Sequence, residues 1–330
     1  MDLMTFFAAD WLGKPAWMWL AFMGVVLALL VLDLGVLHRD QHEIGVRESL
    51  LLSSMYIVVA LIFGGWVWWE LGQQSGLEYL TGFAIEKSLA MDNVFVIALI
   101  FGYFAIPRAL QHRVLFWGIL GVIVLRALMI GAGAALVSQY GWVLYIFAAF
   151  LIVTGVKMFF AGDGHTDIGQ NPLVKWMRRH LRVTDQLHGQ RFFVRQPTAK
   201  GRMVLWATPL FLTLVMIEIA DVIFAVDSVP AIFAITTDPF IVYTSNIFAI
   251  LGLRALYFAL AAVIHRFAYL KQALAVLLVF IGGKVFAADL LGLGKIPPEW
   301  SLAITAAILA AGVFWSLWKT RGDAAPTPSA

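Results

Sequence analysis

The sequence has no cysteine and few charged residues. None of its 330 residues is cysteine, so disulfide bonds and thiolate metal sites within the chain are excluded. Charged residues make up 13% of the sequence, whereas soluble domains contain about 25%. Hydrophobic residues make up 62%. This composition predicts an all-α polytopic membrane protein. Because the N-terminus has no positive segment before its first apolar run, we expect no cleaved signal peptide.

Nine apolar runs approach or exceed the length of roughly 20 residues that a spanning helix needs. They cover residues 16–37, 50–70, 80–104, 114–137, 142–160, 204–235, 240–264, 270–291 and 301–318. Turn-forming segments separate them, among them GQQSG at 72–76 and TTDP at 236–239. The sequence therefore predicts nine transmembrane helices.

Lysine and arginine are distributed unevenly between the predicted connections. The connections on one side of the membrane contain 16 of them, whereas those on the other side contain only Lys14 and Lys295. Short cytoplasmic connections carry an excess of positive charge. The distribution therefore predicts an N-terminus outside the cell and a C-terminus in the cytoplasm.

The longest connection, 161–203, is basic and contains the amphipathic sequence NPLVKWMRRHLRV. Its predicted apolar face comprises Leu173, Trp176, Met177 and Leu181. Basic residues occupy the opposite face, which is typical of a helix lying on an anionic cytoplasmic leaflet. We therefore expect a lipid surface, and no nucleic acid, as the partner of this connection.

Two similar acidic motifs lie inside predicted spans. The first is IEKSLAMDNVFVI at 85–97, and the second is DVIFAVDSVPAIF at 221–233. Their alignment pairs Glu86 with Asp221, Asp92 with Asp227 and Asn93 with Ser228. A charge at membrane depth costs about 2.5–3.5 kcal/mol even on lenient insertion scales. A duplicated acidic motif at this depth favours a function over an isolated structural ion pair.

The similarity extends beyond the acidic motifs. GILGVIVLRAL at 118–128 resembles NIFAILGLRAL at 246–256, and GVKMF at 155–159 resembles GGKVF at 282–286. Each repeat contains three predicted spans. Because three is odd, the second repeat must cross the membrane in the opposite direction, as in many secondary transporters, whose substrate site lies between the repeats.

These repeats divide the chain into five parts. They are two N-terminal spans (1–79), the first three-helix repeat (80–160), the basic cytoplasmic loop (161–203), the second, inverted three-helix repeat (204–291), and the last span with its tail (292–330).

Several charges lie within the predicted spans. The acids are Asp33, Glu86, Asp92, Glu218, Asp221 and Asp227. The bases are Lys87, Arg126, Lys157, Arg254 and Lys284. Together with Asn93 and Ser228, the acids offer oxygen ligands, which suit hard cations such as Mn²⁺, Mg²⁺ or Ca²⁺. Two alternatives stay open: the bases could neutralise the acids in structural pairs or gate a site, and Asp33 could lie at the membrane interface.

Helix periodicity limits how the acids can meet. The pairs separated by seven residues, which share a helix face, are Glu86 with Asn93 and Asp221 with Ser228. On a straight helix, Asp92 points about 120° away from Glu86. We expect the two acidic helices to face each other, with a break near Pro230 that frees the Val226 carbonyl as a ligand.

The two motifs, together with ATPL, EIADVIFAVDSVPAIFAITTDPFIVYTSNIFAILGLRALYF and IGGKVF, resemble the TerC family. Within it, the chain is most similar to the Alx-type manganese exporters, which resemble the larger LysE-type exporter group. The resemblance runs from about Asp33 to Lys284. It implies a bacterial inner-membrane protein that exports Mn²⁺. The implied metal ligands are Glu86, Asp92, Asn93, Glu218, Asp221, Asp227 and Ser228.

We therefore expect a secondary transporter that exports Mn²⁺ by alternating access. It would need no cofactor and would not be an enzyme, and its carboxylates would also allow coupling to protons. One alternative is a membrane scaffold that delivers metal to exported proteins, although the predicted outer connections are short and carry little charge. A membrane enzyme is a weaker alternative because no nucleophile or histidine accompanies the acids. The sequence does not indicate an oligomeric state.

Overall fold

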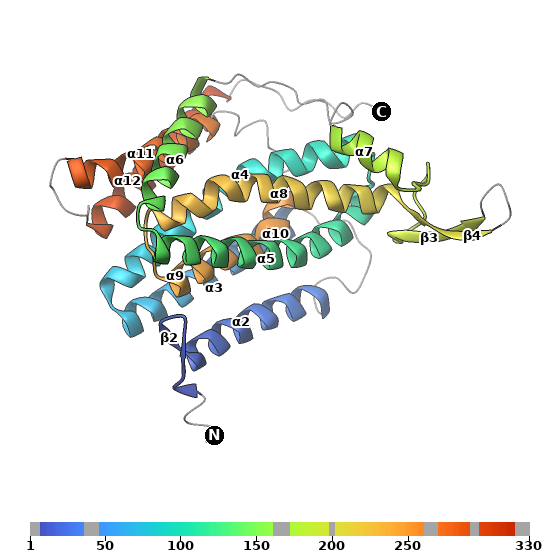
Figure 1. Cartoon of the computed structure of the whole chain (residues 1–330). Helices are drawn as coiled ribbons and strands as arrows, with labels where there is room; N and C mark the ends of the chain where they lie inside the picture. The colour runs from blue at the N-terminus through green and yellow to red at the C-terminus, as the bar shows by residue number, and fades with distance from the viewer. Residues whose placement is uncertain are drawn as a thin grey trace.

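The computed structural model describes residues 7–35, 46–160, 172–197, 202–260, 270–290 and 297–320. These residues are mostly helical (Figure 1). The helices are α2 (Ala16–Gly35), α3 (Val46–Leu71), α4 (Gln73–Tyr103), α5 (Arg108–Gln139), α6 (Val143–Phe160), α7 (Pro172–His180), α8 (Pro209–Phe233), α9 (Pro239–Leu251), α10 (Leu253–Leu260), α11 (Leu270–Leu290) and α12 (Pro298–Lys319). Two antiparallel hairpins pair β1 (Asp10–Trp11) with β2 (Lys14–Pro15), and β3 (Phe193–Pro197) with β4 (Met203–Ala207).

Seven helical segments in the described residues are long and apolar enough to cross a membrane. They are Arg47–Leu71, Arg108–Gln139, Val143–Phe160, Pro209–Phe233, Pro239–Leu260, Leu270–Ala288 and Pro298–Lys319. The described residues therefore confirm a mostly helical chain with several helices able to cross a membrane. Helix α2, whose apolar stretch is shorter, and helix α4, which carries Glu86 and Lys87, are not among the seven. Nine spans therefore remain a prediction.

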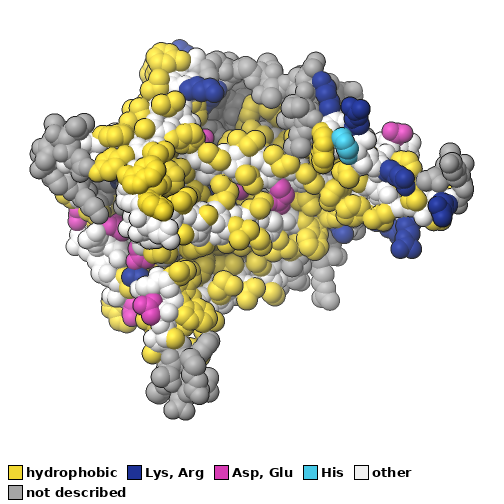
Figure 2. Space-filling model, in the orientation of Figure 1, with side chains coloured by type: hydrophobic (Ala, Val, Ile, Leu, Met, Phe, Trp, Pro, Cys, Tyr) yellow, Lys and Arg dark blue, Asp and Glu magenta, His cyan; other side chains and the backbone are white. Residues whose placement is uncertain are grey.

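The segment Pro239–Leu260, formed by α9 and α10, lies in the middle of the bundle. Of the residues in its most apolar stretch, 94% are buried, whereas in α6 and α12 only 22% are. Helix α9 packs against α3, α4 and α5. Hydrophobic side chains cover the flank of the molecule in Figure 2. Outer helices with apolar, exposed flanks around a buried central helix are the arrangement that lipid requires, because lipid solvates apolar side chains and leaves backbone groups to bond within helices.

Some predicted boundaries are wrong. Helix α4 begins at Gln73, seven residues before the predicted start, directly after Gly72 with its φ of +88°. The run expected to span from 204 begins instead with strand β4, and α8 starts at Pro209. Proline is well suited to the first turn of a helix, because its missing N–H has no intrahelical acceptor there. Apolar composition alone could not separate β4 from the helix that follows it.

The basic connection contains a helix, as predicted, but its buried face differs. In α7, Val174 and Met177 are buried, whereas Trp176 is 55% exposed and stacks on His180 with ring centroids 4.8 Å apart. The side chain of Leu173 lies outside the described residues. Val174 and Met177 pack against the core residues around α8, so this helix is fixed to the protein as well as being basic.

Exposed basic side chains gather at the end of the molecule that carries α7, β3 and β4 (Figure 2). We call this end the basic face; it comprises Lys175, Arg179, Arg182, Arg191, Arg195 and Arg202, all exposed. Arg113, near the start of α5, joins this end through a 2.9 Å bond from its Nη1 to Gln190 Oε1. Helix α8 begins beside this face, directly after β4, and runs to the opposite end of the bundle (Figure 1).

Helices α6 and α11 pack against each other through two glycines. A Cβ at Gly155 of α6 would lie 2.7 Å from the Ala275 carbonyl oxygen of α11, and one at Gly282 of α11 would lie 2.5 Å from the Ala148 carbonyl oxygen of α6. On each helix the glycine lies seven residues after the alanine that the other helix contacts: Gly155 follows Ala148, and Gly282 follows Ala275. The contact is thus reciprocal, and its two glycines belong to the repeated GVKMF and GGKVF sequences.

Gly282→Ala is therefore expected to lower the free energy of unfolding by about 1–3 kcal/mol, the usual cost of an overpacked core. Its neighbour Gly283 is the matched control, because a Cβ there meets nothing within 4 Å. Gly283→Ala should be neutral or stabilising by up to about 1 kcal/mol, through helix propensity alone. Thermal unfolding of both variants in detergent measures this difference. Equal melting temperatures would show that the close approach at Gly282 is not tight.

Candidate functional site

Arg126 lies at the centre of a buried polar cluster. It belongs to α5 and is 1% exposed. Its guanidinium binds Asp221 of α8 through both carboxylate oxygens, with Nε donating to Oδ2 at 3.0 Å and Nη2 to Oδ1 at 3.1 Å. Its Nη1 donates to Glu86 of α4, and to the Ser228 hydroxyl of α8 at 2.6 Å. One arginine thus joins three of the side chains expected to bind metal.

The convergence follows from helix periodicity. Asp221 and Ser228 are two turns apart and point to the same side of α8. Glu86 and Asn93 have the same relation on α4, and Asn93 Nδ2 donates to Asp221 Oδ1 at 3.5 Å. The structure therefore brings the two predicted faces together, with a side chain of α5 between them.

Two acceptor atoms beside the cluster have no hydrogen-bond partner in the part of the chain that the structure describes. They are Asn93 Oδ1 and Glu218 Oε2, both buried. Glu218 precedes Asp221 by one turn, and its carboxylate lies where a Cβ at Gly121 of α5 would be. The missing side chain at Gly121 makes room for this carboxylate. Both unpaired oxygens are of the kind that a hard cation or a donor group would bind.

Of the other predicted acids, only Asp227 can be placed relative to this cluster, and it lies outside it. The side chains of Asp92 and Asp33 lie outside the described residues, although their backbones belong to α4 and α2. Asp227 is half-buried and shares a hydrogen bond with Thr154 of α6. Its position agrees with the angular offset expected from its six-residue separation from Asp221.

The predicted basic partners are spread over the bundle. Arg254 is buried near the start of α10, and Lys157 is exposed near the end of α6. Lys284 Nζ donates to Ser301 Oγ of α12 at 3.1 Å. Among the described contacts, Arg126 is therefore the base that binds both motifs.

Lys87 is placed at a break in the central helix. Helix α9 ends at Leu251 and α10 begins at Leu253, with Gly252 between them. Lys87 Nζ donates to the Ala249 carbonyl at 3.2 Å, and a Cβ at Gly252 would lie 2.7 Å from the same nitrogen. The ammonium thus satisfies a free carbonyl at the negative end of α9. Interrupted helices of this kind occur at transporter binding sites.

The break was expected in α8 and is found elsewhere. Helix α8 continues through Pro230 to Phe233. The interruption at Gly252 was not predicted, because residues 240–264 form one apolar run. A glycine inside this run was the available signal.

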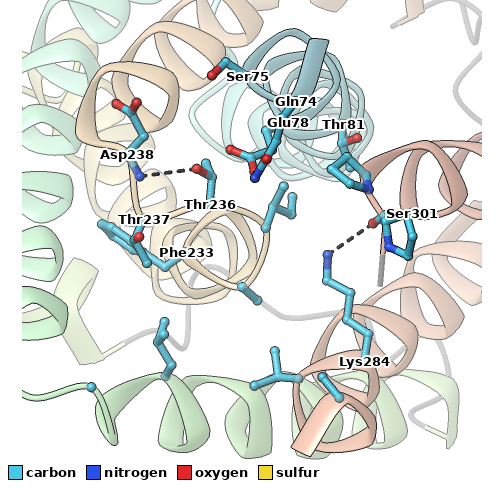
Figure 3. Close-up of a pocket in the computed structure, with 18 of the residues that line it drawn as sticks. Gln74, Ser75, Glu78, Thr81, Phe233, Thr236, Thr237, Asp238, Lys284 and Ser301 are labelled. Atoms are coloured by element: carbon cyan, nitrogen blue, oxygen red, sulfur yellow. Dashed lines mark hydrogen bonds between the residues drawn. The ribbon is translucent and has the colours of Figure 1, made fainter. Parts of the chain in front are cut away.

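A pocket of about 730 Å³ opens at the end of the bundle opposite the basic face, where α8 finishes at Phe233. Figure 3 shows the side chains that line it. We call this end the pocket face. Its polar lining includes Glu78, Thr81, Thr237, Asp238 and Lys284. Four predicted connections meet here, since Gln74, Gly141, Thr237 and Pro297 all line the pocket. These are the connections that charge counting places on one side of the membrane, so the structure agrees with that grouping.

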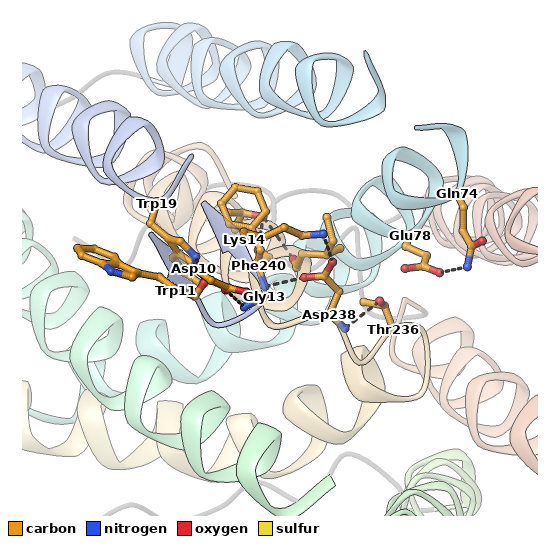
Figure 4. A network of polar contacts seen from close by, with 12 residues as sticks. Asp10, Trp11, Gly13, Lys14, Trp19, Gln74, Glu78, Thr236, Asp238 and Phe240 are labelled. Atoms are coloured by element: carbon orange, nitrogen blue, oxygen red, sulfur yellow. Dashed lines mark hydrogen bonds and ion pairs between the residues drawn. The ribbon is translucent and has the colours of Figure 1, made fainter. Parts of the chain in front are cut away.

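The N-terminal hairpin is attached to the same face (Figure 4). Lys14 Nζ lies 2.9 Å from Asp238 Oδ2. Asp238 also caps α9, because its Oδ1 accepts a bond from the Phe240 N–H at 3.0 Å. Trp19 packs edge-on against Phe240 with centroids 5.1 Å apart. The N-terminus and the loop before α9 are therefore joined at the rim of the pocket.

A thin layer separates the pocket from the Arg126 cluster. On α4, Thr81 of the pocket precedes Glu86 by five residues, and on α8, Phe233 of the pocket follows Ser228 by five. Five helical residues span roughly 7.5 Å. Within this layer, a Cβ at Gly82 would overlap Ile232 and lie 3.0 Å from Ser245 Oγ. The numbers rise along α4 as they fall along α8, so these two helices are antiparallel.

A thicker apolar layer lies between the cluster and the basic face. It includes Ile97, Ile100 and Phe101 of α4, packed in one core with Leu212 and Met216 of α8. All five side chains are buried. The cluster is thus closer to the pocket than to the basic face.

The described residues hold no group of three or more acidic or histidine side chains close enough together to hold a metal ion. The acids of the two motifs are instead joined by a guanidinium. The arrangement can bind one positive charge firmly, and the metal ligand set remains a prediction.

Comparisons with known proteins identify the family. The model of the "Integral membrane protein TerC family" matches residues 71–324. A relative from Escherichia coli (strain K12), named "Putative membrane-bound redox modulator Alx", is 48% identical over 315 residues, covering 93% of this chain and 95% of that protein. "Uncharacterized membrane protein STKORF319" from Myxococcus xanthus is 46% identical over 318 residues, 96% of each chain. No solved structure matches. The chain belongs to the TerC family of integral membrane proteins.

Proposed function

We propose that the protein is a secondary transporter that exports Mn²⁺ from the cytoplasm by alternating access. The observation that carries the proposal is the convergence of Glu86 and Asp221, from two antiparallel helices, on one buried positive charge. Two carboxylates held together inside a membrane require a positive charge beside them, and this requirement supports a cation site. Carboxylate and amide oxygens suit a hard divalent ion such as Mn²⁺.

The same proposal includes two inverted three-helix repeats and nine spans, with α2 and α4 also crossing the membrane. The reciprocal packing of Gly155 and Gly282 supports the repeats. The packing of α4 on α9 and of α5 on α8 supports them too, since each pairs one repeat with the other. The site then lies between the repeats, which is the usual position in such transporters.

The pocket would be the exit to the outside. It lies within about five helical residues of Glu86 and Ser228, and it opens at the end with few basic residues. The basic face would then lie in the cytoplasm of a bacterium, against the inner membrane. The carboxylates that release Mn²⁺ into the pocket could take up protons there and return them to the cytoplasm, which would couple export to the proton gradient. We assign no enzymatic activity and no cofactor.

A redox role, suggested by the name of the Escherichia coli relative, is the second candidate. The chain has no cysteine, so it contains no thiol–disulfide couple of its own. A metal-delivery scaffold is a third candidate, and it predicts that transport requires a partner.

Direct binding tests the proposal. The purified protein should bind Mn²⁺ in detergent at equilibrium, and Glu86→Gln should reduce the affinity by about tenfold or more, which corresponds to about 1.4 kcal/mol. Arg108→Ala, an exposed change at the start of α5, should bind like the wild type. Absence of Mn²⁺ binding, or equal binding by Glu86→Gln, would count against the site.

A further inference from the structure

Arg126 occupies the oxygen atoms that a transported cation would need. It binds both oxygens of Asp221, and its Nη1 binds Glu86 and Ser228. The planar guanidinium matches carboxylate geometry through its parallel N–H groups. Because Arg126 is 1% exposed, water does not share these contacts. An ion cannot bind the same oxygens fully while this arrangement persists.

The charges of the cluster explain why an internal cation is useful. Two carboxylates facing each other without a counter-charge would be strongly destabilised in a buried site. A transporter must pass through a state without substrate, and in that state the carboxylates still need a positive charge. Arg126 supplies one that cannot diffuse away.

We infer that Arg126 is an internal substitute cation, which Mn²⁺ displaces on binding and which returns to Glu86 and Asp221 when Mn²⁺ leaves. The inference rests on the proposed function. It adds that the Arg126 guanidinium competes with Mn²⁺ for the carboxylates and displaces it from the site. Return of the guanidinium would expel the ion toward the pocket and close the site behind it. The contacts seen in the structure are those of the state in which the guanidinium occupies the two carboxylates.

The displaced guanidinium has acceptors nearby. Glu218 Oε2 and Asn93 Oδ1 are buried and without a hydrogen-bond partner among the described residues. Glu218 lies one turn from Asp221 on α8, and the Cβ atoms of residues at this spacing are about 5–6 Å apart. It also rests against Gly121, five residues before Arg126 on the same helix. Arg126 could therefore exchange one carboxylate for another by a side-chain movement within the cluster.

The test uses a variant that lacks the internal cation. Arg126→Ala leaves a space of guanidinium shape between two carboxylates. We expect it to melt at a lower temperature than the wild type. Free guanidinium, at concentrations far below those that unfold proteins, should restore the melting temperature, and so should Mn²⁺. Urea at the same concentrations should not, which controls for a solvent effect.

Competition gives the sharper measurement. Arg126→Ala should bind Mn²⁺ about tenfold or more tightly than the wild type, a change within the range common for coupled sites. Free guanidinium should weaken Mn²⁺ binding to Arg126→Ala competitively, with little effect on the wild type. Arg108→Ala, which removes an exposed arginine of the same helix, should match the wild type in both assays.

A second variant covers the case in which Arg126→Ala does not fold. Arg126→Lys keeps the charge but loses the paired N–H groups, so it should also bind Mn²⁺ more tightly than the wild type while turning over more slowly. If the wild type binds Mn²⁺ and neither variant binds it more tightly, this inference is overturned and the proposed function stays intact. If the wild type and both variants bind no Mn²⁺, the proposed function fails and the inference fails with it.

Discussion

Asp221→Asn is expected to abolish Mn²⁺ transport and to lower the free energy of unfolding by about 3–5 kcal/mol, the usual cost of removing one partner of a buried ion pair. Asp221 is 5% exposed and accepts two hydrogen bonds from Arg126. Asparagine keeps the size of the side chain but loses its charge and one of its two acceptor oxygens. Arg126 would then be left with one carboxylate.

Asp227→Asn is the matched control for stability. Asp227 lies on the same helix, but it is half-buried and hydrogen-bonds to Thr154 instead of to Arg126. Its amide variant should lose less than half as much stability as Asp221→Asn. Denaturant unfolding of both variants in detergent provides the comparison. Equal losses of free energy of unfolding would show that the bonds between Asp221 and Arg126 stabilise the protein no more than the contact of Asp227 does.

Single cysteines placed at the two ends of the bundle should react with an impermeant reagent from opposite sides of the membrane. The difference in labelling should be close to all-or-none. The natural chain has no cysteine, so each variant carries one reactive thiol without further changes. Thr237→Cys, exposed in the pocket, should react with an impermeant maleimide in intact cells. Arg179→Cys, exposed on the basic face, should react only after the cells are permeabilised.

A third cysteine tests the closed layer on the basic side of the site. Val94 is fully buried, on the basic side of Glu86, and Val94→Cys should resist the reagent applied from either side when Mn²⁺ is absent. The reverse labelling of Thr237→Cys and Arg179→Cys would invert the proposed orientation. Fast external labelling of Val94→Cys would contradict the closed apolar layer between the cluster and the basic face.

Helix periodicity predicted which polar side chains share a face of α4 and of α8, because the spacing of two residues on a helix determines the angle between their side chains. Glu86 and Asn93 meet Asp221 and Ser228 as their seven-residue spacing requires. The role of Arg126 could not be predicted in the same way. Nothing in the sequence distinguishes it from Arg254, its counterpart in the repeat, and only the packing of α5 against α8 places its guanidinium between the two motifs.

The predicted helix boundaries were less accurate where a single apolar run contains both a strand and a helix, or two helices. Val204 belongs to strand β4 and Leu210 to helix α8, although both lie in one apolar run. The break at Gly252 depends on a tertiary partner, the Lys87 ammonium that satisfies the Ala249 carbonyl. At Pro230 the opposite occurs, since α8 remains helical there. Local sequence alone does not decide between these outcomes.

Mn²⁺ flux in liposomes containing only the purified protein tests the central claim most directly. The wild type should carry Mn²⁺ across the membrane without a partner, whereas Asp221→Asn and Glu86→Gln should not exceed protein-free liposomes. Variants that reconstitute in equal amounts and remain folded make the comparison valid. Equal flux through the wild type and both variants would contradict the account, as would wild-type liposomes that carry no Mn²⁺.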